Sequence, residues 1–334
     1  MTFMSETGNS GYPASAPAPS GPLRMTPGRW LVLGLALPVA LALIGWAGFD
    51  LVSLVARGTY SFSSPVPVQS GQVNVNVNGA DVTLRQTSGN TARLTGSVQY
   101  GLFRPDFTES TTAGGTAVGV NCIALNSSCN VNATLDVPAR TAVTLNSGGG
   151  NIGVSGFSSN LTLSAAGGNL TASNLTGNLL LDTGGGDLTG SGLAGNTNHI
   201  STEGGNIDAS SLDGPMRLDT GGGDLNGNGF TGSLQVFTAG GNIDASAVAS
   251  QQVNVQSGGG DVTLAFTQPP QNLQITANGG NIDVILPHGD TKYAISTPGN
   301  SGGNINIQPG LAGPTSNTIS VNSGGGDITI TEAS

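Results

Sequence analysis

The sequence predicts an all-β protein: a parallel β-solenoid (β-helix) of about 18-residue repeats behind a single N-terminal transmembrane helix. Three observations predict this class. A motif of two glycines, an Asp or Asn and an aliphatic residue recurs ten times between Gly149 and Ile328. Apolar residues alternate with polar ones through these repeats. One uncharged hydrophobic run, from Trp30 to Phe49, precedes them.

The repeat has a nearly constant stride. Successive motifs lie about 18 to 20 positions apart, and the last two intervals lengthen to about 23 positions. A unit this short cannot bury an apolar face by itself, so its copies must stack on one another. We interpret the residue that closes each motif as part of a structural turn ladder, whose members are Asn151, Asn169, Asp187, Asn206, Asp224, Asn242, Asp261, Asn281, Asn304 and Asp327.

Alternation with a period of two predicts strands on both sides of each motif. In a stack, equivalent aliphatic residues such as Leu170, Leu188 and Ile207 form one interior ladder, and Leu163 and Leu181 belong to a second. Neighbouring rungs of a β-sheet lie about 4.8 Å apart, so ten copies give a stack about 50 Å long.

The glycines of each motif are expected to turn a tight corner. Such a corner demands positive φ, which glycine adopts without steric cost. The following Asp or Asn is expected to bond nearby backbone N–H groups. A valine at Gly185 should therefore damage its corner, because β-branched residues resist positive φ.

The corner residue alternates strictly between Asn and Asp from Asn169 to Asn281. If one unit makes a rung, carboxylates lie two rungs, about 9.6 Å, apart, and Asn amides bridge them. The octapeptide LDTGGGDL at 181–188 recurs at 218–225, so a pair of units is an alternative rung. That longer rung would stack Asp on Asp and require a cation between them. We favour the shorter one.

The repeats define the predicted domains. Residues 141–332 form the β-solenoid, and residues 71–140 form an N-terminal β cap that protects the open end of the stack. Within the cap, 72–86 alternates around a tight turn and is predicted to be a degenerate first repeat. Cys122 and Cys129 are predicted to form a disulfide that closes a small loop. A metal site is disfavoured, because no His, Asp or Glu lies between them.

The hydrophobic run predicts a transmembrane helix over residues 30–56, because about 20 helical residues span roughly 30 Å. Arg24 and Arg29 precede the run and orient the N-terminus towards the cytoplasm. Residues 1–29 are then a disordered cytoplasmic tail, and 57–70 a linker to a repeat domain outside the cell membrane. A cleaved signal peptide is the alternative. The length and late start of the run favour an uncleaved anchor.

Composition limits the partners. The formal net charge is −10 and Lys292 is the only lysine. A nucleic-acid partner is excluded, since phosphate binding needs clustered Lys or Arg. Besides the membrane, the expected partner is a cell-wall glycan or a surface protein, because Thr, Ser, Asn and Gln suit weak multivalent contact.

No catalytic or cofactor-binding residues are predicted. The two histidines, His199 and His288, are far apart in sequence and are expected in surface loops. Arg217 beside Asp219 is the only local charged cluster, and a surface ion pair explains it. A carbohydrate-active enzyme is a further hypothesis, which would need paired carboxylates at a suitable separation or carboxylates with a nearby Arg or Lys. Here the acids occupy equivalent turn positions, which the structure of the repeat requires.

No metal-binding residues are predicted either, and calcium binding is kept as an alternative role for the corner acids. Corner acids such as Asp187 and Asp224, with second acids such as Asp208, supply oxygen ligands of the kind calcium prefers. The motif lacks the second glycine and aspartate of calcium-binding nonapeptide repeats, so structural turn acids are favoured.

The chain resembles the putative-adhesin (DUF4097-type) β-strand-repeat domains of bacterial cell-envelope proteins. The resemblance rests on the lead-in DVPARTAVTLNSGGGNIGVSG at 136–156 and on the iterated corner motifs, and it covers roughly residues 70–332. It implies a β-solenoid displayed outside the membrane, sometimes associated with envelope-stress operons, with no established catalytic residues.

The leading functional hypothesis is a membrane-anchored, surface-exposed β-solenoid that acts as a non-catalytic adhesion or binding module. The alternative is an envelope-stress accessory or regulatory membrane protein that senses the cell wall.

Overall fold

The computed structural model describes residues 36, 39–41, 43–44, 58–101, 104–112, 115–121, 129–299 and 302–333. The chain divides into two units, Met1–Val52 and Ser53–Ser334. In the first unit the few described residues are helical. The described residues contain no helix of the length and hydropathy needed to cross a membrane. Most of the predicted tail and transmembrane helix lies outside the described residues.

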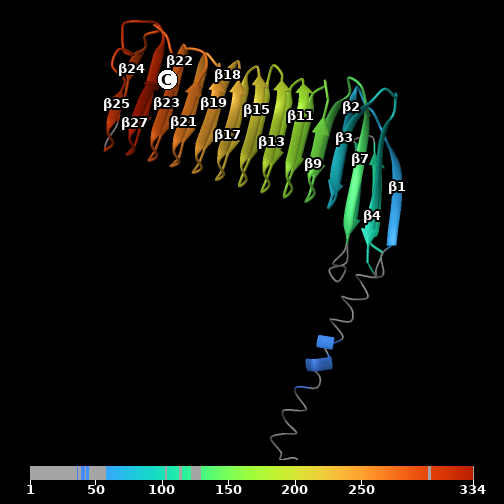
Figure 1. The fold of residues 1–334 in the computed structure, drawn as a ribbon. Coiled ribbons are helices and arrows are strands. Elements are labelled where there is room, and N and C mark those ends of the chain that lie inside the picture. The colour runs from blue at the N-terminus through green and yellow to red at the C-terminus, as the bar shows by residue number, and fades with distance from the viewer. Residues whose placement is uncertain are drawn as a thin grey trace, which may run out of the picture. The chain divides into compact units, whose positions relative to one another are not determined.

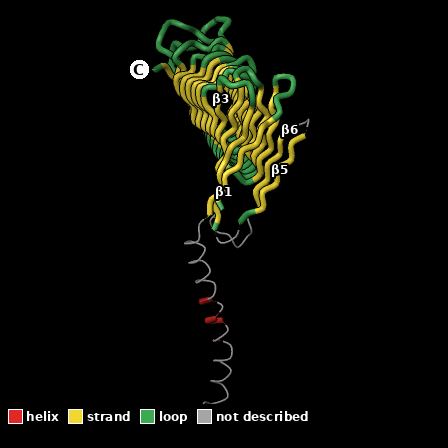
Figure 2. The backbone as a smooth tube through the Cα atoms, turned by 90° about the vertical axis from the view of Figure 1, so that its right-hand side faces the viewer, coloured by secondary structure: helices red, strands yellow, loops and turns green. Residues whose placement is uncertain are grey.

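The second unit consists of two stacked β-sheets (Figures 1 and 2). The 14-stranded sheet, here sheet A, contains, in spatial order, β1 (Gly58–Val66), β4 (Ala92–Tyr100), β7 (Asn130–Pro138), β3 (Asp81–Thr87), β9 (Ile152–Ser155), β11 (Leu170–Thr176), β13 (Leu188–Ala194), β15 (Ile207–Asp213), β17 (Leu225–Phe230), β19 (Ile243–Val248), β21 (Val262–Phe266), β23 (Ile282–Leu286), β27 (Ile328–Glu332) and β25 (Ile305–Ile307).

The 13-stranded sheet, here sheet B, contains, in spatial order, β24 (Ala294–Ser296), β26 (Thr318–Ser323), β22 (Asn272–Ala277), β20 (Gln252–Ser257), β18 (Ser233–Thr238), β16 (Met216–Thr220), β14 (Asn198–Thr202), β12 (Leu179–Thr183), β10 (Leu161–Ala165), β8 (Ala142–Ser147), β2 (Gln72–Asn78), β6 (Gly115–Asn121) and β5 (Asp106–Thr112).

Each repeat contributes one strand to each sheet, and the glycine corner joins the two. Leu170 pairs in parallel with Leu188, and Leu188 with Ile207, so a single repeat makes one rung. Leu163 pairs with Leu181 in sheet B. These residues are fully buried, which confirms the predicted solenoid and both interior ladders.

A buried hydroxyl closes most of the corners. The third position before the last glycine is Ser or Thr at Ser147, Thr183, Thr202, Thr220, Thr238, Ser257 and Ser323. Thr220 Oγ1 donates to the Gly223 carbonyl at 2.6 Å, and Thr202 Oγ1 accepts from Gly205 N–H at 2.9 Å. The hydroxyl thus satisfies backbone groups that the turn removes from the sheet.

The expectation that corner glycines have positive φ is wrong. None of the corner glycines 148–150, 184–186 or 221–223 has positive φ. Their requirement is steric instead. A Cβ on Gly186 would overlap the carbonyl oxygen of Gly168, the equivalent glycine one rung away. The middle glycine, Gly185, faces open space, so the sequence-based prediction for its replacement by valine loses its basis.

Positive φ occurs instead late in the sheet A strands, before the chain returns to sheet B. Six equivalent positions in successive rungs have φ between 50° and 75°: Gly156, Asn174, Gly192, Ser211, Gly229 and Ala247. Three of these residues are not glycine. At the three that are, a Cβ would meet no backbone atom closer than 3.6 Å, so this position excludes a side chain less strictly than the corners do.

The N-terminal cap contains a complete rung. Val75 of β2 pairs with Leu145 of β8, and Leu84 of β3 pairs with Val154 of β9. The prediction that 72–86 is a degenerate first repeat is therefore confirmed. Beyond this rung, β7, β4 and β1 extend sheet A, and the antiparallel hairpin β5–β6 extends sheet B (Figure 2).

The predicted linker 57–70 is mostly a strand. β1 pairs antiparallel with β4 at the edge of sheet A and buries Phe62 and Val66. The strand pattern is carried by alternating Tyr60, Phe62, Ser64 and Val66, whereas the prolines in and after β1 are typical of a linker. Proline is tolerated here because β1 is an edge strand.

At the C-terminal end, the last two rungs exchange places. β27 lies between β23 and β25, so the strand latest in sequence is not the outermost in sheet A. In sheet B, β26 likewise lies between β22 and β24. The longer intervals between the last motifs provide the extra chain that this exchange requires.

Candidate functional site

The ten residues of the turn ladder align along one edge of the solenoid. Each backbone N–H donates to the side-chain oxygen of the corner residue one rung away, at distances of 2.7–2.9 Å. Asp81 of the cap is an eleventh member, accepting from Asn151 N–H at 2.8 Å. Asp and Asn are interchangeable in this role because both present an oxygen acceptor.

This geometry corrects the predicted amide bridges. The links run from backbone to side chain, and among the described corner residues only Asn304 also donates its amide to a carboxylate, at Asp327. The exchange of the last two rungs places Asp327 between Asn281 and Asn304. The Asn–Asp alternation therefore continues in space where it breaks in sequence, and no two corner carboxylates of the ten repeats are adjacent.

The remaining predicted site residues do not assemble into a reactive group. Within the described residues, no three His, Cys, Asp or Glu side chains are placed to hold a metal ion. Cys129 is disulfide-bonded. The chain's other cysteine, Cys122, lies outside the described residues, so the pairing between the two stays a prediction.

The outer face of sheet B is a candidate binding surface. Two rows of side chains cross its strands in register. Row 1 contains Asn74, Thr144, Thr162, Leu180, His199, Arg217, Gln235, Asn254, Gln274 and Ser320. Row 2 contains Asn76, Asn146, Ser164, Asp182, Ser201, Asp219, Phe237, Gln256, Thr276 and Asn322. Neutral amides and hydroxyls make up both ends of each row, with charges confined to the middle.

The middle of this face carries a compact ionic cluster. Asp219 Oδ2 lies 2.6 Å from His199 Nε2 and accepts from Arg217 Nε at 2.7 Å. The Arg217 guanidinium also lies over the ring of Phe237, 4.2 Å from its centroid. The four side chains come from three adjacent strands, β14, β16 and β18. The other carboxylate oxygen, Asp219 Oδ1, is buried and has no hydrogen-bond partner within the described part of the chain.

The two histidines differ in position. His199 lies on β14, which corrects the prediction of a surface loop, because a repeat strand places every second side chain on the outer face. His288 follows β23 in a loop, as predicted, with its side chain 85% exposed.

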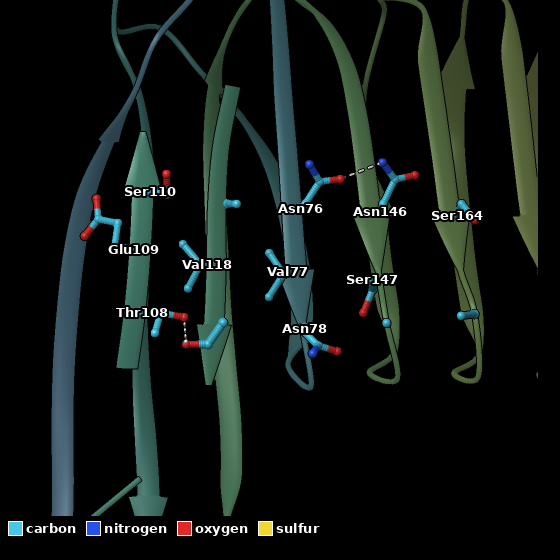
Figure 3. A pocket seen from close by; sticks show the side chains of 14 residues that line it. Asn76, Val77, Asn78, Thr108, Glu109, Ser110, Val118, Asn146, Ser147 and Ser164 are labelled. Atoms are coloured by element: carbon cyan, nitrogen blue, oxygen red, sulfur yellow. Dashed lines mark hydrogen bonds between the residues drawn. The ribbon is translucent and has the colours of Figure 1, made fainter. Parts of the chain in front are cut away.

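A cavity of about 540 Å³ lies at the N-terminal end of sheet B, beside the β5–β6 hairpin (Figure 3). Asn76 and Asn146 line it from adjacent strands, and Asn146 Nδ2 donates to Asn76 Oδ1 at 2.8 Å. Thr108 of β5 donates to the Gly119 carbonyl of β6 at 3.3 Å. The lining combines neutral polar side chains with apolar ones such as Val77 and Val118, and Glu109 is its charged residue.

A second cavity of about 540 Å³ lies over the middle of sheet B, next to the ionic cluster. Sequence reasoning identified Arg217 and Asp219 but missed their partners. The missed signal is the stride: one repeat interval separates His199 from Arg217, and the same interval separates Asp219 from Phe237. Residues one stride apart become neighbours in a stack of this period.

One family model and two solved structures are similar to this chain. The family model described as Toastrack DUF4097 matches residues 71–331. A solved structure of a "putative cell adhesion protein" from Clostridium sporogenes is 13% identical, covers 83% of this chain and 100% of that chain, and has a TM-score of 0.21. A "putative lipid binding protein" from Parabacteroides distasonis is 13% identical, covers 84% and 97%, and has a TM-score of 0.33. The search of curated proteins gives no match.

Proposed function

The chain belongs to the Toastrack DUF4097 family, and we propose that its repeat domain is a non-catalytic binding or adhesion module that acts through the outer face of sheet B. An N-terminal membrane anchor displays this domain outside the cell in the proposal. The partner is a cell-wall glycan or a surface protein, contacted weakly at many equivalent positions.

The observation that carries the proposal is the pair of registered rows on sheet B. Parallel pairing repeats the same outer position at every rung, about 4.8 Å apart. Amide side chains such as Asn146 and Gln235 offer both a donor and an acceptor at these positions. A rigid array of such groups binds a repetitive partner by multivalency, because each further contact becomes intramolecular.

Sheet A is the less suitable face. Its outer positions include Asp208, Asp244 and Asp283 on alternate rungs, beside the edge that carries the turn-ladder acids. Those carboxylates are not paired with a basic side chain among the described ion pairs. On sheet B, by contrast, Asp219 is paired with Arg217, and Asp182 accepts a hydrogen bond from the Ser201 hydroxyl at 2.6 Å. An uncharged or weakly charged partner therefore meets less unfavourable desolvation on sheet B.

The test compares the two faces of the full-length protein, purified in detergent, for binding to the wall fraction and to intact cells of the producing organism. The double variant Asn146→Arg/Gln235→Arg obstructs sheet B. Thr171→Arg/Thr189→Arg adds the same charge at exposed positions of sheet A. We expect the sheet B double variant to bind the wall fraction and cells at least tenfold more weakly, which corresponds to a loss of about 1.4 kcal/mol of binding free energy. The sheet A double variant should bind nearly as well as the unchanged protein.

If the two double variants bound the wall fraction and cells equally well, with unchanged melting temperatures, sheet B would not be the binding face. Loss of retention by the sheet A pair alone would transfer the function to the opposite face.

A further inference from the structure

We propose that the cavity beside Phe237 is a subsite for one sugar ring of an uncharged glycan. This inference rests on the proposed binding function of sheet B and names the ligand class at one place on that face. Multivalent contact along the rows does not need such a subsite, so the two proposals can fail separately.

The cavity has the size and position of a ligand site. Its volume of about 540 Å³ lies within the roughly 300–1,000 Å³ typical of small-molecule pockets. Phe237 and Gln256 of row 2 line it, together with Gly258 and Asn278 at the glycine corners. Gly258 has no side chain, so the cavity is deeper there than beside its larger neighbours.

Phe237 provides the apolar surface that a sugar ring requires. It is the only Phe, Tyr or Trp in the two rows of described side chains, and it is partly exposed. The C–H face of a pyranose packs on aromatic surface, while its rim of hydroxyls needs polar partners. The guanidinium of Arg217 lies over one face of this ring, 4.2 Å from its centroid, so the proposal places the sugar against the rest of the ring surface.

The polar lining matches hydroxyl groups. Gln256 and Asn278 each present an amide donor and an amide acceptor, and Thr276 adds a hydroxyl. Neither the Gln256 nor the Thr276 side chain forms a hydrogen bond with another described side chain, so their donors and acceptors are not used within row 2. A sugar hydroxyl, which donates and accepts at once, satisfies such groups in pairs.

The charges indicate an uncharged ligand. Arg217 and Asp219 are the charged residues that line the cavity, and they are bound to each other at 2.7 Å. Their opposite charges cancel, so neither a carboxylate nor an ammonium group gains a net attraction. A neutral saccharide meets this lining without leaving a charge unpaired.

The experiment measures binding of two neutral probes, the trisaccharide of N-acetylglucosamine and cellotriose, to the full-length protein in detergent. Ligand-observed saturation-transfer NMR and titration calorimetry provide the readouts. We expect binding of at least one probe at millimolar Kd, and a Phe237→Ala variant should weaken it at least about tenfold.

A matched pair of glutamines provides the control. Gln256→Ala removes an amide from the cavity and should weaken binding about threefold to tenfold. Gln274→Ala removes the same side chain from row 1 on the adjacent strand, outside the cavity, and should have no effect. Melting temperatures identify any variant that fails to fold, and Gln256→Ala keeps the test valid if Phe237→Ala does.

Three outcomes overturn the subsite: no binding of either probe, equal binding by the two glutamine variants, or binding that is unchanged in Phe237→Ala. If the Asn146→Arg/Gln235→Arg protein nevertheless loses retention on cells or wall, the broader function stands and only the subsite fails. If the probes bind at Phe237 but sheet B variants retain normal cell and wall binding, the adhesion role fails instead.

Discussion

Glycines at the corners and glycines late in the sheet A strands are needed for different physical reasons. At the corner edge, which joins sheet B to sheet A, the last glycine of each motif has ordinary φ and lies against the backbone of the next rung. Late in the sheet A strands, the six equivalent positions have positive φ and are as often Asn, Ser or Ala as Gly. The turns that follow carry glycines such as Gly214 and Gly232, which combine positive φ with close approach to the backbone of the neighbouring rung. Close stacking, rather than backbone conformation, therefore explains why the corner motif tolerates so little variation.

Close stacking also explains why the first corner position is glycine on some rungs and a larger residue on the rungs between them. Gly184, Gly221 and Gly258 occupy the first corner position on alternate rungs, where a Cβ would overlap the backbone of the rung before. The intervening rungs carry larger residues such as Glu203 and Ala239. Unlike units in alternation thus pack better than identical ones, which accounts for a sequence period of two units although each rung is a single unit.

The largest expected effect is at the last corner glycine. Gly186→Ala should lower the free energy of unfolding by about 3 kcal/mol, because its methyl group would overlap the Gly168 carbonyl and force two rungs apart. Chemical denaturation of the purified protein measures this change. A loss below about 0.5 kcal/mol, the range of ordinary surface substitutions, would break the steric explanation.

A smaller loss is expected at the turn ladder. Asp224→Ala removes the acceptor for Asn242 N–H, now bonded at 2.7 Å, and should cost about 1–2 kcal/mol. Asp224→Asn keeps the oxygen and should cost little. If the Asn variant were as unstable as the Ala variant, the carboxylate charge and not the hydrogen bond would be the stabilising feature.

The positive-φ positions late in the sheet A strands should respond with the opposite sign. Ala247 has φ of 50°, so Ala247→Gly should raise stability by about 0.5–1 kcal/mol through relief of left-handed strain. Ala245→Gly, on the same strand but buried at ordinary φ, should lower stability by about 1 kcal/mol. Thermal unfolding of the two variants compares the signs, and a shared sign would contradict the assignment of strain.

The smallest effect is expected at the middle corner glycine. Gly185 has open space around it and ordinary φ, so Gly185→Ala should change stability by no more than about 0.5–1 kcal/mol, towards greater stability. Measured beside Gly186→Ala, it separates the steric requirement from a general need for glycine at the corner. Comparable damage at both positions would mean that the whole corner resists substitution.

Much of the fold was predictable because its signals are local and repeated. The period of two indicated the strands, and the stride of the corner motif indicated the rung, so Leu170, Leu188 and Ile207 could be aligned before their pairing was known. The resemblance based on residues 136–156 and the corner motifs is confirmed by the family match over 71–331. β1 was missed because its prolines resemble a linker, although an edge strand accommodates them.

The candidate site was harder to predict. Arg217 and Asp219 are close in sequence and were identified, whereas His199 and Phe237 join them only through pairing across rungs. The rows of sheet B likewise exist only once every strand's register is known. That these groups form a binding face is the proposal that the face and subsite variants test.

The sequence by itself determined the repeat, the burial pattern and the position of each corner, since these follow from periodicity and residue chemistry along the chain. Only the tertiary structure decided why the corner glycines are needed, which residues share the ionic cluster, and that the last two rungs exchange places. Those features depend on contacts between residues at least one repeat apart in sequence, and the distances across such contacts are set by how the rungs stack.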